Sequence, residues 1–196
     1  MDSMNSYGHQ SLSEEESKLF DHYYNLDGKQ HREFCQIFGP DKIAENAGNF
    51  VGYYLIRKIM LPGDEMGEAA SVVAKFLSWL CEKNIVPAQE IKEEIERAER
   101  AAKELPAAED ANQIIWQLAQ KSLKNEEDYM DFGSLTIMRI EKGSLHFETE
   151  SGETVGPVDV PKKAALLLKT GWTVNCALAK SNGKWHFAEV GNVYPD

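Results

Sequence analysis

The chain has 196 residues, of which 42% are apolar, 27% charged and 10% aromatic. This is an ordinary globular composition, and it excludes collagen-like and wholly disordered classes. With 21 basic and 32 acidic residues, the net charge is −11. Such a charge opposes binding to nucleic-acid phosphates unless a local basic patch overrides the average.

The cysteines and the hydropathy bear on where the protein resides. Cys35, Cys81 and Cys176 are odd in number and form no CxxC pair, which favours a reducing compartment. The first ten residues are polar and lack the apolar segment of a secretory signal. The longest apolar stretch, 50–61, contains Arg57 and Lys58 and is shorter than the ~20 residues of a membrane span. The sequence therefore predicts a cytoplasmic protein without a membrane partner.

The spacing of apolar residues changes near residue 130. Before it they recur every three or four residues, and after it they alternate between turn signals. This predicts an α+β protein with an N-terminal helical bundle of about six helices and a small C-terminal five-stranded β-barrel. The expected divisions are a disordered tail over 1–12, the bundle over 13–124, a linker over 125–130 and the barrel over 131–196.

The first helix is predicted to begin at Ser13, because Ser13 and Glu16 have the spacing of a capping box. Gly48 and Gly52 are four residues apart and predict close helix packing. Further helices are expected over about 29–38, 41–60, 64–83 and 87–104, and from Pro106 onward.

The C-terminal segment predicts strands in the order β-β-β-short helix-β-β. Leu135 and Ile137 alternate with polar residues, and Lys142-Gly143 and Asn182-Gly183 are hairpin turn signals. A short helix is expected over 162–169. This order suits a small barrel, which closes to remove exposed sheet edges. Most of the net negative charge lies before the predicted strands, because residues 1–130 hold 14 basic and 24 acidic side chains.

The sequence contains no motif for a reactive centre or a phosphate-binding loop. His31 and Cys35 are four residues apart, but no nearby pair supplies the two further ligands of a structural zinc site. Asp27-Gly28 is interpreted as a turn rather than as a calcium loop. We therefore expect no cofactor and no metal, and we favour a non-catalytic function. An enzyme or small-ligand binder with a pocket between the two domains is an open alternative.

Two binding hypotheses follow. In the first, the protein binds an unidentified protein partner through exposed residues near the domain join and in the tail, namely Tyr129, Met130, Phe132 and Tyr194. In the second, the barrel binds nucleic acid through aromatic stacking, with phosphates held by Lys162, Lys163, Lys180 and Lys184. The net charge disfavours the second, and the alternation predicts that Trp172 and Trp185 fill the core. The oligomeric state is not predicted.

One segment has a family resemblance. The pattern Phe50-x-x-Tyr53-Tyr54-Leu55, followed by Val73-x-x-Phe76-Leu77-x-Trp79-Leu80, resembles the helical core-binding domain of tyrosine recombinases over residues 50–85. In that family such helices clamp DNA ahead of a catalytic domain. The resemblance implies a pair of packed helices here. The Arg…HxxR…Tyr pattern of the catalytic domain is missing from the rest of the chain.

Overall fold

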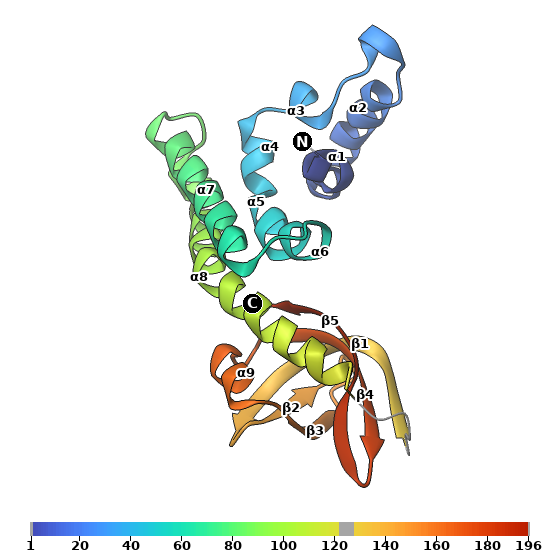
Figure 1. Cartoon of the computed structure of the whole chain (residues 1–196). Coiled ribbons are helices and arrows are strands. Elements are labelled where there is room, and N and C mark those ends of the chain that lie inside the picture. Colours follow the sequence, from blue (N-terminus) through green and yellow to red (C-terminus); the bar gives the residue numbers. More distant parts are fainter. Residues whose placement is uncertain (1, 122–127, 196) are drawn as a thin grey trace. The chain divides into compact units, whose positions relative to one another are not determined.

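A computed structural model describes residues 2–121 and 128–195. It has an α+β architecture in which helices precede a five-stranded sheet, as predicted (Figure 1). The chain divides into two compact units. The helical unit comprises Met1–Ile59 and Glu68–Ala102, and the sheet unit comprises Met60–Gly67 and Lys103–Asp196. The predicted linker 125–130 lies partly outside the described residues, and its last three residues belong to a strand.

Helix α2 (Glu14–Tyr24) begins with the capping box that the sequence predicts. The Ser13 backbone N–H donates to Glu16 Oε2 at 2.8 Å, and the Glu16 N–H donates to Ser13 Oγ at 3.3 Å. The helical segments are α1 (Asp2–Tyr7), a 3-10 turn (Gly8–Ser11), α2 (Glu14–Tyr24), a second 3-10 turn (Gly28–Gln30), α3 (Phe34–Ile37), α4 (Pro40–Glu45), α5 (Ala47–Asn49), a π-helical segment (Phe50–Tyr54), α6 (Leu55–Lys58), α7 (Gly63–Glu82) and α8 (Ala88–Ala119).

The number and division of these helices differ from the six or so that were predicted. The single helix expected over 41–60 is split after α4, where the Asn46 side-chain amide donates to the Lys42 carbonyl at 2.8 Å. That carbonyl would otherwise accept the Asn46 backbone N–H, so the side chain competes with the helical ladder. Conversely, the helices expected on either side of Pro106 form one helix, α8. The hydrogen bond lost at Pro106 does not end α8, and Leu105 and Ala108 on either side of the proline are buried.

The segment expected to be a disordered tail, 1–12, contains α1 and the first 3-10 turn. Asn5 Oδ1 accepts a hydrogen bond from the Phe34 backbone N–H at 2.9 Å, and Gly8 lies against the Phe34 ring. Phe34 is fully buried and contacts the rings of Phe20 and Phe38. The N-terminal residues are therefore tied to the aromatic core of the helical unit.

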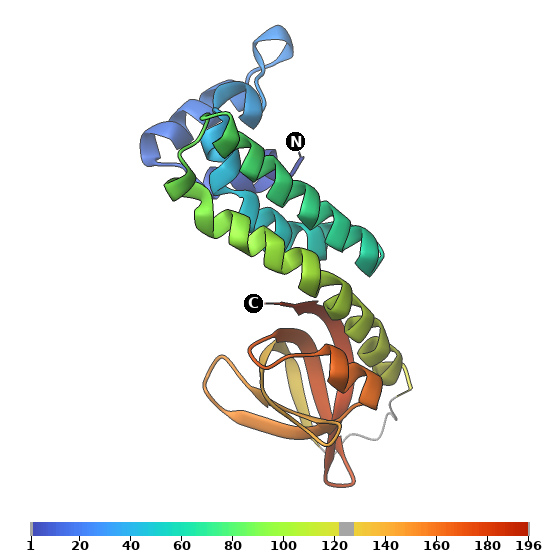
Figure 2. The ribbon, with the colours of Figure 1, turned by 90° about the vertical axis from the view of Figure 1, so that its left-hand side faces the viewer.

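The remaining core of the helical unit lies along α7 and the first part of α8. These two helices run side by side in opposite directions (Figures 1 and 2), and Leu77, Leu80 and Ile91 are buried in one cluster with Ala44 and Ala47. The close packing predicted for Gly48 is present, because a Cβ there would meet the Glu94 and Arg97 side chains. The same prediction is wrong for Gly52, where a Cβ would meet nothing within 4 Å.

The five strands close into a ring in the order β1-β2-β3-β5-β4, and β4 pairs with β1. All pairings are antiparallel except that of β3 with β5, which has one register pair, Val158 with Trp185. The elements are β1 (Asp128–Glu141), β2 (Ser144–Glu148), β3 (Thr154–Asp159), α9 (Lys162–Leu167), β4 (Thr173–Ser181) and β5 (Lys184–Tyr194). The two hairpin turns predicted at Lys142-Gly143 and Asn182-Gly183 are present, and all four residues have positive φ.

The core of the sheet unit includes part of a helix. Inward-facing residues such as Ile137, Phe147 and Leu178 are fully buried, and they form one cluster with Ala108, Ala111, Ile115 and Ala119 of α8. The C-terminal half of α8 thus packs with the strands and not with the helical bundle to which the sequence analysis assigned it. Trp172 is buried in this core as expected, whereas Trp185 is only partly buried against it.

Within the described part of the chain, no helix combines the length and the hydropathy that crossing a membrane requires.

Candidate protein-binding surface

The outward face of β1, β4 and β5 carries aromatic residues that are distant in the sequence. Tyr129 of β1 is paired with Ala179 of β4, and Ala179 is also paired with His186 of β5. Ala179 follows Leu178 and His186 precedes Phe187, and both of these neighbours belong to the core. Because successive side chains of a strand point to opposite faces, Ala179 and His186 project outward. Tyr129 shares that face because directly paired residues project to the same side.

Tyr194 reaches the same face from the end of the chain. Thr136 lies between the buried residues Leu135 and Ile137, and therefore projects outward. Thr136 is paired with Thr173, and Thr173 with Tyr194. The Tyr194 hydroxyl accepts a hydrogen bond from Asn192 Nδ2 at 3.3 Å, which fixes the position of the ring. The two tyrosines thus lie on one sheet face although 64 residues of sequence separate them.

A bulge in β1 turns Phe132 outward. Met130 pairs with Leu178 and Gly133 with Cys176, so β1 has two residues where β4 has only Ala177. Bulges of this kind redirect a side chain. The Phe132 ring lies over Gly191 of β5, where a Cβ would come within 2.9 Å of it. We call Tyr129, Phe132 and Tyr194, together with the small residues Ala177, Ala179 and Gly191 between them, the aromatic face.

The floor of the aromatic face is closely packed, while its rings remain accessible. Ala177 and Ala179 are 0% exposed although they project outward. Tyr129 is 47% exposed and Phe132 is 50% exposed. The exposed rings, and not the small residues beneath them, therefore form the apolar surface that a partner could contact.

Met130 does not belong to this face, contrary to the sequence prediction. It pairs with the fully buried Leu178 and packs against the core of the sheet unit. The prediction failed because it started the strand after Met130. Once β1 is seen to begin at Asp128, alternation requires Met130 and Tyr129 to point to opposite sides.

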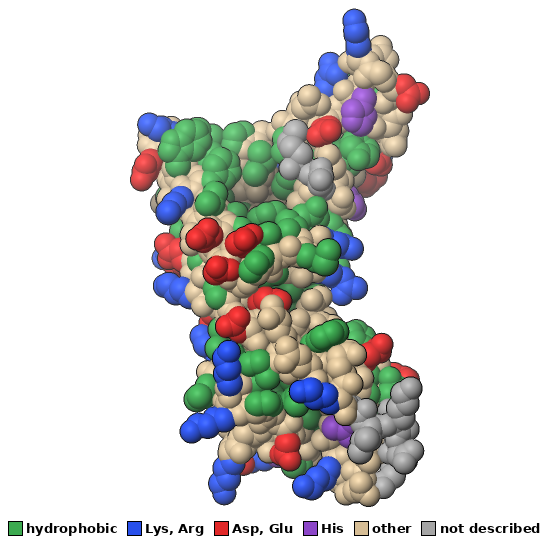
Figure 3. Space-filling model, viewed as in Figure 1, with side chains coloured by type: hydrophobic (Ala, Val, Ile, Leu, Met, Phe, Trp, Pro, Cys, Tyr) green, Lys and Arg blue, Asp and Glu red, His purple; other side chains and the backbone are tan. Residues whose placement is uncertain are grey.

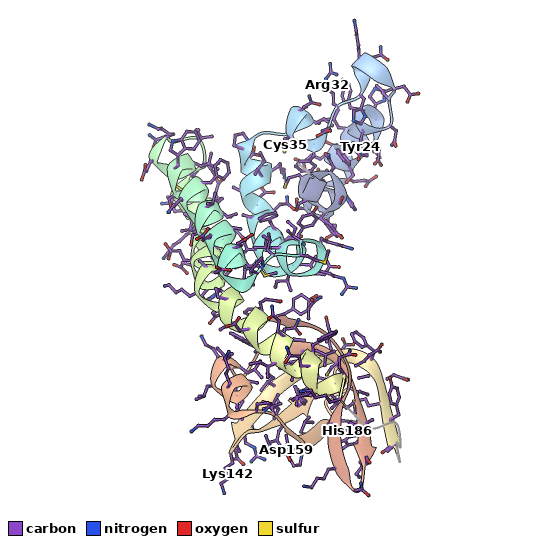
Figure 4. The ribbon with its side chains drawn as sticks, in the orientation of Figure 1. Tyr24, Arg32, Cys35, Lys142, Asp159 and His186 are labelled. Atoms are coloured by element: carbon purple, nitrogen blue, oxygen red, sulfur yellow. The ribbon has the colours of Figure 1, made fainter. Side chains whose placement is uncertain are left out.

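His186 adds one unusual polar group to the face. Its Nε2 atom is buried and forms no hydrogen bond with the described residues. His186 lies on β5 near the β4–β5 hairpin (Figure 4). Sequence reasoning gave no signal for this residue, because only the strand register places it beside Ala179.

The four lysines predicted to hold phosphates do not gather in one place. Lys162 and Lys163 begin α9, which leads into the start of β4, whereas Lys180 and Lys184 flank the turn after its end. The nine residues of β4 span about 25 Å at the usual rise per residue. Figures 1 and 2 show α9 and the β4–β5 hairpin as separate features. Lys180 also lies over the Trp185 ring, 5.7 Å from its centre.

The described residues contain no cluster of three or more His, Cys, Asp and Glu side chains that could hold a metal. His31 Nδ1 donates to the Tyr24 carbonyl at 2.8 Å, and Tyr24 and Cys35 belong to the α2–α3 segment (Figure 4). Burial raises the pKa of the Cys35 thiol, and the Glu33 charge adds to this effect. Burial also raises the pKa of Cys176, to about 12.

The helical unit contains an apolar groove that sequence reasoning missed. It has a volume of about 170 Å³. The groove lies between α1, α4, α5, the π-helical segment and α7. Residues 1–12 were expected to be a disordered tail, so the side of the groove formed by α1 was not predicted. The lining residues are Ser3, Met4, Ile43, Asn46, Ala47, Phe50, Val73, Phe76 and Leu77.

No protein-family model matches this chain, and no curated protein does either.

Proposed function

We propose that this is a non-catalytic protein-interaction protein whose binding surface is the aromatic face, and that its five-stranded ring is a small β-barrel. One observation carries the proposal. Three aromatic residues from the two ends of the sheet unit share one outward face, and two of them are about half exposed. Exposed apolar residues scattered singly are ordinary, whereas rings that share one face form a patch of the kind that marks an interaction site.

The chemistry of the aromatic face suits a protein partner. Aromatic side chains are enriched at protein interfaces, because they bury a large area and lose little conformational freedom. Tyrosine also provides a hydroxyl group at the wet edge of an interface.

The alternative, nucleic-acid binding, receives less support from the charges. Phosphate contacts need several Lys or Arg side chains along one path, and the predicted lysines lie as two pairs at opposite ends of β4. Asp128 and Asp131 adjoin Tyr129 and Phe132 in sequence, and Glu189 is paired with Ala177. An acidic border disfavours phosphates and favours a partner with basic residues around an apolar centre.

The test compares two surface variants of the full chain in capture from an extract of the cells that make the protein. Phe132→Ser removes a half-exposed ring from the aromatic face. Met138→Ser is the matched control, since Met138 lies on the same strand, near β2, and is 51% exposed. We expect wild type and Met138→Ser to capture the same partner in stoichiometric amounts. Phe132→Ser should capture at least tenfold less of that partner.

Two results would contradict the proposal. The first is equal capture by both variants, provided that circular dichroism shows both to be folded. The second is tight binding of a 20-nucleotide single strand to the wild type at low salt that weakens steeply as salt is added and is lost in Phe132→Ser. That result would assign the face to nucleic acid.

A further inference from the structure

Helix α7 carries an apolar stripe on its exposed side. Val72, Phe76 and Trp79 are 63%, 38% and 45% exposed, and spacings of four and three residues place them on one face of the helix. The rings of Phe76 and Trp79 are stacked, with centroids 6.2 Å apart. Figure 3 shows hydrophobic side chains gathered over this part of α7.

Opposite charges lie at the two ends of the stripe. Glu68 precedes Val72 by four residues, and Lys83 follows Trp79 by four residues, so both continue the same line. Both side chains are exposed. Neither forms an ion pair within the part of the chain that the structure describes.

We propose that α7 packs antiparallel against α7 of a second copy of this chain, across a two-fold axis that passes between residues 75 and 76. In this register, Glu68 faces Lys83 of the second copy, and Val72 faces Trp79 of the second copy. Lys75 faces Phe76 of the second copy, which is a cation–π arrangement. Every contact occurs twice, as an isologous interface requires.

Charge complementarity selects the second copy and the antiparallel direction. In a parallel arrangement Glu68 would face Glu68 and Lys83 would face Lys83, and like charges in direct contact are unfavourable. The antiparallel arrangement pairs both charges and covers the whole apolar stripe. It needs no other partner, because α7 is complementary to itself.

The groove described above adjoins the stripe. Phe76 belongs both to the stripe and to the lining of the groove, which continues to Phe50 and Met4. Trp79 of the second copy would stand over Val72, at the edge of this apolar surface. Because only a few apolar side chains are covered, the contact is smaller than a standard interface. We expect the dimer to have a dissociation constant of about 10–100 µM.

Analytical ultracentrifugation of the full chain between about 5 and 500 µM tests this. The expected mass rises from that of a 22.1 kDa monomer toward twice that value. Trp79→Ser should raise the dissociation constant at least tenfold. Glu68→Lys and Lys83→Glu should each raise it about fivefold or more. The double variant Glu68→Lys/Lys83→Glu should restore it to within about twofold, because reversing both charges recreates the pair.

The matched control is Glu99→Lys, which makes the same charge change at an exposed position on α8 and should leave association unchanged. A mass of 22.1 kDa at every concentration would overturn the proposal. Dimerisation that persists in Trp79→Ser, or a double charge reversal that fails to restore it, would also overturn it. Each variant is checked for native helix content by circular dichroism.

Discussion

The interaction between Ser13 and Glu16 shows how single residues set local stability. Hydrogen bonds from the Ser13 backbone and side chain lower the pKa of Glu16, and Lys42 lowers it further. The folded state therefore favours the ionised carboxylate. The stability that this carboxylate contributes is complete above the pKa of Glu16 in the unfolded chain, near the ordinary value of 4.5. It is lost as the pH falls through the lowered pKa of Glu16 in the folded protein.

Replacing the serine tests this interaction. Ser13→Ala should lower the free energy of unfolding by about 1 kcal/mol at pH 7, because an N-cap is lost. The difference from wild type should shrink as the pH falls through the lowered pKa of Glu16, because the carboxyl group is then protonated in both proteins. Urea unfolding at pH 7 and pH 3 measures both effects. Glu15→Gln, in the same helical turn, is the control and should change little.

The three thiols should differ in reactivity. Cys176 is 1% exposed, and its pKa of about 12 leaves almost no thiolate at neutral pH. A disulfide reagent at pH 8 should therefore leave Cys176 unmodified in the native protein and modify it after urea is added. The raised pKa of Cys35 should make that thiol slower than a free cysteine. Modification of all three thiols at one rate in the native state would contradict the buried position of Cys176.

At the scale of elements, the start of α7 depends on a close approach to α8. A Cβ on Gly63 would lie 2.9 Å from the Pro106 carbonyl oxygen and 3.0 Å from its Cα. These are backbone atoms and cannot move aside as a flexible side chain can. Gly63→Ala should therefore lower the free energy of unfolding by about 1–3 kcal/mol.

Gly52 provides the matched control, because a Cβ there meets nothing within 4 Å. Gly52→Ala should leave stability unchanged or raise it by about 0.5 kcal/mol, since alanine restricts the unfolded chain. Chemical denaturation of both variants distinguishes them. Equal effects would show that Gly63 does not face Pro106 closely.

The limits of the sequence prediction are clearest for individual helices and strands. Apolar periodicity predicted one helix over 41–60, and most of this segment is helical. It gave no sign that the Asn46 side chain would bond to the Lys42 carbonyl, where the segment divides. Pro106 was interpreted as a break, although a proline leaves most of the ladder intact and α8 continues through it. The hairpin turns were predicted correctly because their signal is local, in residues such as Asn182-Gly183 that tolerate positive φ.

At the scale of the whole molecule, the central structural finding is that the end of α8 belongs to the sheet unit. Ile115 is 0% exposed and lies in one cluster with core residues of the strands. Ile115→Ala should lower the free energy of unfolding by about 2–5 kcal/mol. The neighbouring Trp116 is 49% exposed, so Trp116→Ala should cost less than about 1 kcal/mol.

Amide hydrogen exchange shows which elements the Ile115→Ala substitution destabilises. Opening caused by Ile115→Ala should speed exchange in β1 and β4 more than in α2. Faster exchange confined to the helical unit would instead support the division at residue 130 that the sequence predicted.

Periodicity alone could not have assigned the end of α8. Ile114, Ile115 and Leu118 form an apolar stripe that would suit either a helical bundle or a sheet. The α+β order and the strand order along the chain were predictable because each depends on local patterns. The aromatic face was only partly predictable, since Phe132 is placed by a bulge and Tyr194 by the pairing of β4 with β5. The likeness of residues 50–85 to the core-binding domain of tyrosine recombinases remains a prediction.

The most direct test of the account is photo-crosslinking from the aromatic face in living cells. A benzoylphenylalanine placed at position 132 replaces one exposed ring with another, and the same group at position 138 serves as the reference. The account predicts one discrete protein adduct from position 132 and none of that mass from position 138. The same adducts from both positions, or none from position 132, would contradict a protein-binding role for this face.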